Sequence, residues 1–121
     1  MRFLFGLLLS CNLLASTHFF VLGSGTPNPN PERMGSAYLV LVDDTPYLFD
    51  FGPGVVRRVA ALTTNWGGSF SNFDVTKLEY AFLSHIHSDH TMGLSDFLIP
   101  HGSWVEMKES NFLVLKISRI W

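Results

Sequence analysis

Three of the five histidines of this 121-residue chain fall within six consecutive residues, with an aspartate between them. His85, His87, Asp89 and His90 form the pattern H-x-H-x-D-H directly after a predicted β-strand. His85 and His87 are two positions apart, so in an extended segment their imidazoles project to the same side. Asp89 and His90 follow where the chain is expected to turn into a helix, which brings their side chains to a second possible ligand position near the two imidazoles. Packing three imidazoles and a carboxylate together without a metal is costly, so the pattern indicates a metal site for Zn²⁺, with Mn or Fe also suited.

Composition supports a packed domain around this motif. Hydrophobic residues make up 47% and charged residues 15% of the chain, which excludes a disordered chain. The net charge is -2 and there is no long basic run, which argues against a large phosphate-tracking surface. A single cysteine excludes an internal disulfide framework and a Cys-rich zinc module.

Apolar runs and turn residues predict a chain of alternating strands and helices. Proline, asparagine and glycine make residues 26–35 a loop. The near-continuous apolar run 36–42 predicts a strand that is buried on both faces and pairs with the next strand as a hairpin through a turn at 43–46. Gly52-Pro53-Gly54 is expected to open a helix whose apolar face contains Val55 and Val59, while Arg57 and Arg58 face mostly solvent. The expected strands are 18–22, 36–42, 47–51, 78–84 and 112–117, and a second helix is expected at 91–98.

The N-terminus has the features of an export signal. Met1-Arg2 supplies a short positive region, and the apolar stretch that follows is too short to span a bilayer of ~30 Å. Residues 1–16 are therefore predicted to be a signal peptide. The residues before Cys11 also resemble a bacterial lipoprotein box, which leaves lipid anchoring at that cysteine as an alternative. A secreted or periplasmic location follows from either reading, with no transmembrane helix once the signal is removed.

Further motifs extend the pattern upstream. Residues 21–27 (VLGSGTP) look like the first strand and loop of the ribonuclease Z and arylsulfatase-like branch of the metallo-β-lactamase-fold hydrolase superfamily. Residues 28–33 (NPNPER) are similar to exported bacterial members of that branch, and residues 49–54 (FDFGPG) match its strand-end Asp-x-Gly. With H-x-H-x-D-H, the chain resembles this superfamily from about residue 18 to residue 98.

The resemblance implies a role for each residue of the motif. His85 and His87 would hold a first metal ion, and Asp89 and His90 a second. Asp89 would also act as a catalytic residue that orients a bridging hydroxide or accepts its proton. Asp50 would accept hydrogen bonds that steady the metal-binding loop, although a turn-forming aspartate at a strand end is the alternative. Zinc, two ions in a complete family site, is the expected cofactor.

The fold implied is α/β: the N-terminal half of an αββα sandwich, with a mixed sheet and flanking helices. Residues 17–100 would form a partial metallo-β-lactamase domain, and residues 101–121 are an atypical C-terminal tail. The family needs three more ligands after the motif, and beyond Leu98 the sequence holds one histidine, His101, and no aspartate. His101 lies in a Pro-His-Gly turn too close to the motif to match. The chain is therefore expected to be truncated.

Two functions are carried forward. The first is a metal-dependent hydrolase in which a metal-bound hydroxide attacks a phosphodiester, sulfate ester, lactone or similar ester-like bond of a small-molecule substrate. The second is a non-catalytic remnant that binds metal weakly or needs a partner chain to complete the fold. The export signal and the acidic balance argue against a nucleic acid substrate. Arg33, in the loop near the expected cleft, is a candidate to contact an anionic substrate, and a surface arginine is the alternative.

Overall fold

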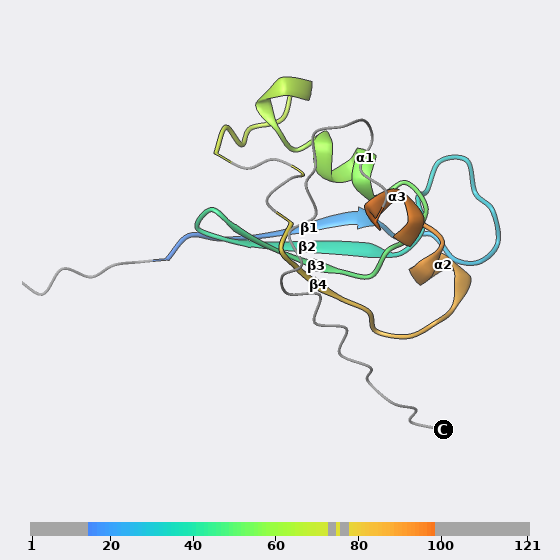
Figure 1. Cartoon of the computed structure of the whole chain (residues 1–121). Helices are drawn as coiled ribbons and strands as arrows, with labels where there is room; N and C mark the ends of the chain where they lie inside the picture. The colour runs from blue at the N-terminus through green and yellow to red at the C-terminus, as the bar shows by residue number, and fades with distance from the viewer. Residues whose placement is uncertain (1–14, 73–74, 76–77, 99–121) are drawn as a thin grey trace, which may run out of the picture.

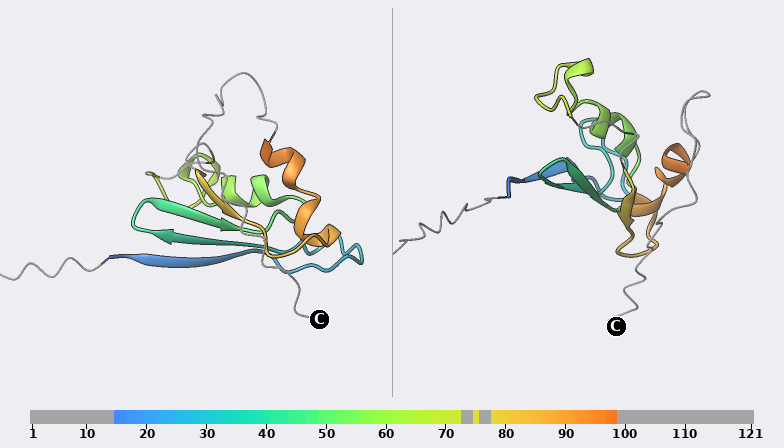
Figure 2. Two further views of the ribbon diagram at one scale, coloured as in Figure 1. Left: turned by 60° about the horizontal axis from the view of Figure 1, so that its bottom comes forward. Right: turned by 60° about the vertical axis from the view of Figure 1, so that its left-hand side comes forward.

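A computed structural model describes residues 15–72, 75 and 78–98 of the chain. Within these residues one mixed sheet carries the fold, with strands in the order β1-β2-β3-β4 and helices on one of its faces (Figures 1 and 2). The strands are β1 (Thr17–Gly23), β2 (Ala37–Val42), β3 (Thr45–Phe49) and β4 (Tyr80–Phe82). The first three strands are antiparallel neighbours, whereas β4 is parallel to β3.

The predicted hairpin is confirmed, but its turn is shorter than expected. Only Asp43 and Asp44 form the turn, and β3 begins at Thr45 and ends at Phe49, not at 51. Asp43 makes the tight turn by adopting a positive φ of 52°, a conformation that aspartate tolerates better than most residues. Pro46 lies inside β3, opposite Leu41, and β4 pairs only with the part of β3 that follows it. A proline is tolerated there because no neighbouring strand needs its missing N–H.

The core lies on the face of the sheet that the helices cover. Leu39 and Leu48 are fully buried partners on β2 and β3, and they belong to the same core cluster as Phe51 and Val55. The other buried apolar side chains are Leu22, Ala37, Leu41, Val59 and Ala81. Burying a Leu or Phe side chain contributes about 1.5–3 kcal/mol, so this small set supplies much of the stability of the sheet.

The opposite face of the sheet is apolar but only partly buried. Burial alternates along β2, so Tyr38 and Val40 remain half-exposed, and the expectation that this strand is buried on both faces is wrong for the described residues. Aromatic rings stack across neighbouring strands on this face: Phe19 with Tyr38, Tyr47 with Tyr80, and Phe49 with Phe82. The described helices cover the other face of the sheet, so no second layer of described residues covers this side.

Three short helices and a 3-10 turn complete the described structure: α1 (Val55–Ala60), η1 (Thr64–Trp66), α2 (Ser88–Thr91) and α3 (Leu94–Leu98). Helix α1 follows Gly54, whose φ of 84° makes the entry turn, and it buries Val55 and Val59 as predicted. The helix predicted at 91–98 is instead two helices, because the chain bends at Gly93, and the first begins three residues earlier. The strand predicted at 78–84 shortens to three residues. No helix among the described residues has the length and apolar character needed to cross a bilayer.

Several predictions lie outside the described residues. These are most of the signal peptide with Cys11, the tail with His101, and the strand at 112–117.

Candidate metal centre

Three stretches of backbone meet at the end of the sheet and fix the turn that carries the histidine motif. The amide of Phe51 donates to the carbonyl of His90 (2.8 Å), and the amide of Gly93 donates back to the carbonyl of Phe51 (2.7 Å). The amide of Gly52 donates to the carbonyl of Ser36 (3.1 Å). Glycine is required for this approach, since a Cβ at Gly52 or Gly93 would lie 2.2–2.3 Å from backbone atoms. Helix α2 is thus held against the end of β3 by main-chain contacts.

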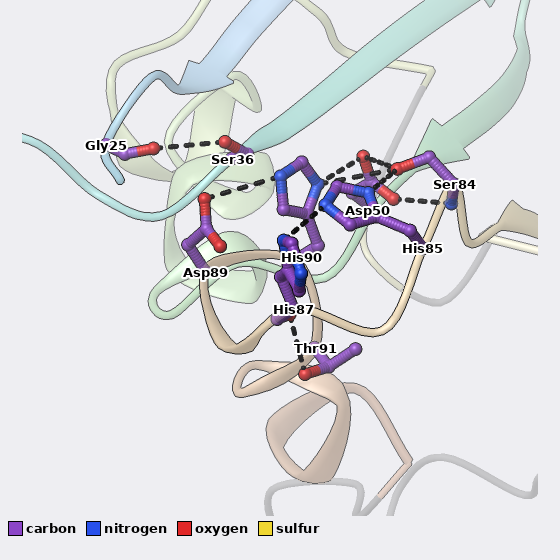
Figure 3. Close-up of polar contacts among 9 residues, drawn as sticks. All are labelled: Gly25, Ser36, Asp50, Ser84, His85, His87, Asp89, His90 and Thr91. Carbon is purple, nitrogen blue, oxygen red and sulfur yellow. Dashed lines mark hydrogen bonds and ion pairs between the residues drawn. The ribbon is translucent and has the colours of Figure 1, made fainter. Parts of the chain in front are cut away.

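Asp50 lies at the centre of the polar network beneath the histidines (Figure 3). It is 4% exposed and has a positive φ of 64°. One carboxylate oxygen accepts a hydrogen bond from the amide of Ser84 (2.7 Å), and the other accepts from the Ser84 hydroxyl (2.8 Å). The second oxygen also contacts Nδ1 of His90 at 2.7 Å. Asp50 therefore ties the end of β3 to both ends of the histidine motif.

This network fixes which ring nitrogens are free to bind a metal. A carboxylate only accepts hydrogen bonds, so Nδ1 of His90 carries a proton, and in the neutral ring its Nε2 keeps a lone pair. The Ser84 hydroxyl donates to Asp50, so it accepts from Nδ1 of His85, 3.0 Å away. The Nε2 of His85 then also keeps a lone pair. Asp50 thus orients the ring of His90 directly and the ring of His85 through Ser84. Metal-binding histidines are commonly oriented by such a hydrogen bond to the second ring nitrogen.

The four motif side chains come together as two pairs. Nε2 of His85 lies 3.1 Å from Nδ1 of His87, and Nε2 of His90 lies 3.3 Å from a carboxylate oxygen of Asp89. The pairs are adjacent, because the rings of His85 and His90 have centroids 4.0 Å apart. The hydroxyl of Thr91 bonds the carbonyl of His87 (3.0 Å), which joins that residue to α2.

These spacings fit a tetrahedral metal. Two ligands about 2.0–2.1 Å from one zinc ion lie about 3.3 Å from each other, close to the separation in both pairs. Asp89 is 7% exposed, and its other oxygen is buried without any hydrogen-bond partner in the described structure. A buried carboxylate oxygen left unpaired is costly, and a cation would satisfy it. No group of three or more His, Cys, Asp or Glu side chains converges on one point within the described residues, so each pair offers two ligands.

Sequence reasoning missed Ser84 and Thr91. The serine immediately precedes the first histidine, and its hydroxyl relays the hydrogen bond of Asp50. A small hydroxyl residue at a strand end is also common where no site exists, so the sequence alone offered no signal. Asp50 accepts hydrogen bonds from Ser84, while its predicted role of steadying a metal-binding loop and metal binding by the four motif residues stay predictions.

Comparisons with known proteins agree with this geometry. A family model of the Metallo-beta-lactamase superfamily matches residues 30–102, more than half of the chain. Ribonuclease Z of Mycobacterium marinum is 39% identical over 85 residues, which cover 70% of this chain and 26% of that protein. Ribonuclease Z of Mycolicibacterium gilvum is 35% identical over 92 residues, covering 76% and 27% respectively. The chain therefore spans about a quarter of the length of these relatives.

A solved structure gives the same fold. The metallo-beta-lactamase fold protein YhfI from Bacillus subtilis aligns with a TM-score of 0.52 and 23% identity, over 67% of this chain and 29% of that one. The α/β class, with a partial metallo-β-lactamase sheet and its helices, is thereby confirmed. Members of this superfamily generally bind metal ions, usually zinc. The family model, the relatives and the sheet together show that this chain belongs to the metallo-beta-lactamase superfamily and resembles its ribonuclease Z branch.

Proposed function

We propose that the chain carries the first metal-binding motif of a metal-dependent hydrolase. The observation that supports this most strongly is the network under the motif. Asp50 and Ser84 leave the Nε2 atoms of His85 and His90 as lone-pair donors. The buried oxygen of Asp89, which has no partner among the described residues, adds a third donor.

The residues divide the work as follows. His85 and His87 would hold one ion, and Asp89 and His90 a second, with zinc favoured by the imidazole and carboxylate donors. When bound, such ions activate a water molecule as a nucleophile and polarise the bond to be cleaved. Asp89 would also orient the attacking water and hold its proton. Asp50 acts only through His90 and Ser84, since it is buried beneath them.

The substrate class that we propose is an ester-like bond, with a phosphodiester first. The relatives named ribonuclease Z favour a phosphodiester over a sulfate ester or lactone. For this chain we retain a small-molecule substrate, because the chain holds 8 basic and 10 acidic residues and so lacks the excess of positive charge that suits a long polyanion.

We also propose that the protein is exported, which sequencing of the mature N-terminus would test.

Metal content tests the motif directly. The purified chain, dialysed against zinc and then against metal-free buffer, is expected to retain at least one ion per chain by elemental analysis. The double variant His85→Ala/His87→Ala is expected to lose the ion held by that pair. His18→Ala is the matched control, since His18 is exposed on β1 and, among the described residues, its ring contacts Ser16, Phe20 and Phe70 and none of the motif. Unchanged metal content in the double variant would show that these two histidines do not bind the ion.

Activity separates the hydrolase from its alternative. Hydrolysis of a bis-aryl phosphodiester, abolished by a chelator and by Asp89→Asn, would support the enzyme. The alternative is a non-catalytic chain that binds metal weakly or needs a partner chain, and the pairing of only two donors at each position within the described residues favours it. Metal binding without hydrolysis of a phosphodiester, sulfate ester or lactone would establish that alternative.

A further inference from the structure

A cavity of about 130 Å³ lies at the end of β1. Its wall consists of residues 21–24 at the strand end, residues 32–34 of the following loop, and Arg58 of α1. A buried water needs roughly 10–15 Å³ of such volume, so the cavity has room for several waters or for one small polyatomic ion. No step of the proposed hydrolysis uses it.

Two arginines line this cavity, and neither is neutralised within the described residues. Arg33 and Arg58 both contribute to the wall, and no ion pair joins either to a carboxylate there. Arg58 donates from Nε to the carbonyl of Leu22 (3.0 Å), which anchors its side chain along the strand end. Its two terminal nitrogens make no other hydrogen bond in the described structure. Arg57, the next residue to Arg58, does not line the cavity.

The loop that carries Arg33 is folded before any ligand arrives. The amide of Arg33 donates to the carbonyl of Asn30 (3.2 Å), and the amide of Glu32 donates to the Asn30 side chain (2.9 Å). The base of the loop is closed by the amide of Gly25, which donates to the carbonyl of Met34 (2.7 Å). A Cβ at Gly25 would lie 2.6 Å from that carbonyl oxygen, so the two sides of the loop are in direct backbone contact. Preorganisation of this kind lowers the entropy cost of binding.

We propose that this cavity binds an oxyanion, a phosphate or sulfate group, between Arg33 and Arg58. Guanidinium groups match such ions because their planar N–H donors bond two oxygens at once. Glu32 also lines the cavity, and its negative charge repels an anion and so lowers the affinity of the cavity for phosphate or sulfate. The anion comes either free from solution or as the phosphoryl group of a larger ligand.

The position of the cavity supports the phosphoryl group of a larger ligand as the source of the anion. Strands β1, β3 and β4 all end at the same end of the sheet, because β1 and β3 both run antiparallel to β2, and β4 is parallel to β3. The cavity and the histidine motif thus lie at one end of the sheet, and a Cβ at Gly35, which directly follows the cavity wall, would lie 2.8 Å from the carbonyl oxygen of Asp89. A ligand held at the motif can therefore place a second phosphoryl group in the cavity.

The experiment uses the full chain with metal removed by chelator, so that phosphate cannot bind through an ion. Inorganic phosphate and phenyl phosphate are titrated separately by calorimetry at constant ionic strength. Saturable one-to-one binding is expected. Arg33→Gln and Arg58→Gln are each expected to weaken it at least tenfold, since each removes hydrogen bonds between charged groups. Glu32→Gln is expected to strengthen it. Phenyl phosphate binding as tightly as phosphate identifies a phosphoryl group on a larger ligand, and weaker binding identifies the free ion.

Arg57→Gln is the matched control, with the same change of charge on the same helix outside the cavity. It is expected to leave the phosphate affinity unchanged, and equal weakening by all three arginine variants would reduce the effect to diffuse surface charge and overturn the site. Absence of saturable phosphate binding would overturn it as well. Arg33→Gln keeps the test sound if Arg58→Gln unfolds, since no hydrogen bond from the Arg33 side chain supports the fold of the described residues. Binding is measured without metal, so failure of this site and failure of the hydrolase are independent results.

Discussion

Replacement of Asp50 by asparagine isolates the contribution of one buried charge to the motif. Asparagine has nearly the same shape and tolerates the positive φ of 64° at this position, so backbone strain does not change. The amide oxygen can keep the bond from the Ser84 amide. The amide nitrogen cannot accept the bonds from the Ser84 hydroxyl and from Nδ1 of His90, which are 2.8 and 2.7 Å long in the native chain.

The magnitude follows from these two lost bonds. A hydrogen bond to a charged group contributes about 1.5–3 kcal/mol, and Asp50 is 4% exposed, so solvent does not replace its partners. The Ser84 hydroxyl can turn and accept from the new amide, which places the expected destabilisation near the lower end, at about 3 kcal/mol. For a domain of this size that corresponds to a loss of roughly 12–24 °C in Tm. The zinc affinity of the motif is expected to fall about 10–100-fold, because His90 loses the bond that orients it.

Thermal and urea unfolding of the metal-free protein, followed by circular dichroism, measure the first effect. Asp44→Asn is the control, since Asp44 is an exposed residue of the hairpin turn. A Tm of Asp50→Asn within a few degrees of the Asp44→Asn control would refute the reasoning, because the buried network would then contribute nothing. Asp50→Ala is expected to cost more than Asp50→Asn, since alanine loses all three bonds and tolerates the positive φ poorly.

Three further substitutions test the packing that supports the motif. Gly93→Ala places a Cβ 2.3 Å from a backbone carbonyl oxygen, so it is expected to lower the free energy of unfolding by about 1–3 kcal/mol and to weaken zinc binding, as calorimetry would show. Leu39→Ala empties a fully buried position and is expected to cost about 2–5 kcal/mol in urea unfolding, whereas Val21→Ala, on the half-exposed face, should cost much less. Thr91→Val removes the hydroxyl that bonds the carbonyl of His87; a loss of about 1 kcal/mol is expected, and no change in Tm would contradict it.

The parts of the fold that the sequence predicts well are those that depend on local pattern. The apolar runs at 18–22 and 36–42 became β1 and β2, and the Gly-Pro-Gly stretch preceded α1 as expected. The spacing of His85 and His87 correctly placed both side chains together, since two positions apart in extended chain is a purely local relation.

Features that depend on contacts between distant segments could not be predicted from the sequence. The length of β3 is set by where Asp50 leaves the sheet to reach Ser84, 34 residues away. The break between α2 and α3 arises where Gly93 meets the end of β3. Arg57 and Arg58 are both exposed as expected, but the bond from Arg58 to the carbonyl of Leu22 and its place in the cavity wall could not be read from the sequence. Each depends on a partner that no periodicity reveals.

The main-chain crossing at Phe51, Gly52 and Gly93 has a consequence for how this corner can change. The turn is fastened by amides and carbonyls, while the side chains of His85 and His87 point outward and are exposed. Main-chain atoms therefore set the position of the turn, and side-chain atoms set which ligands it offers. A cysteine or glutamate introduced at position 85 or 87 would keep the same main-chain support, so the proposed ligands can change here with little penalty to the architecture.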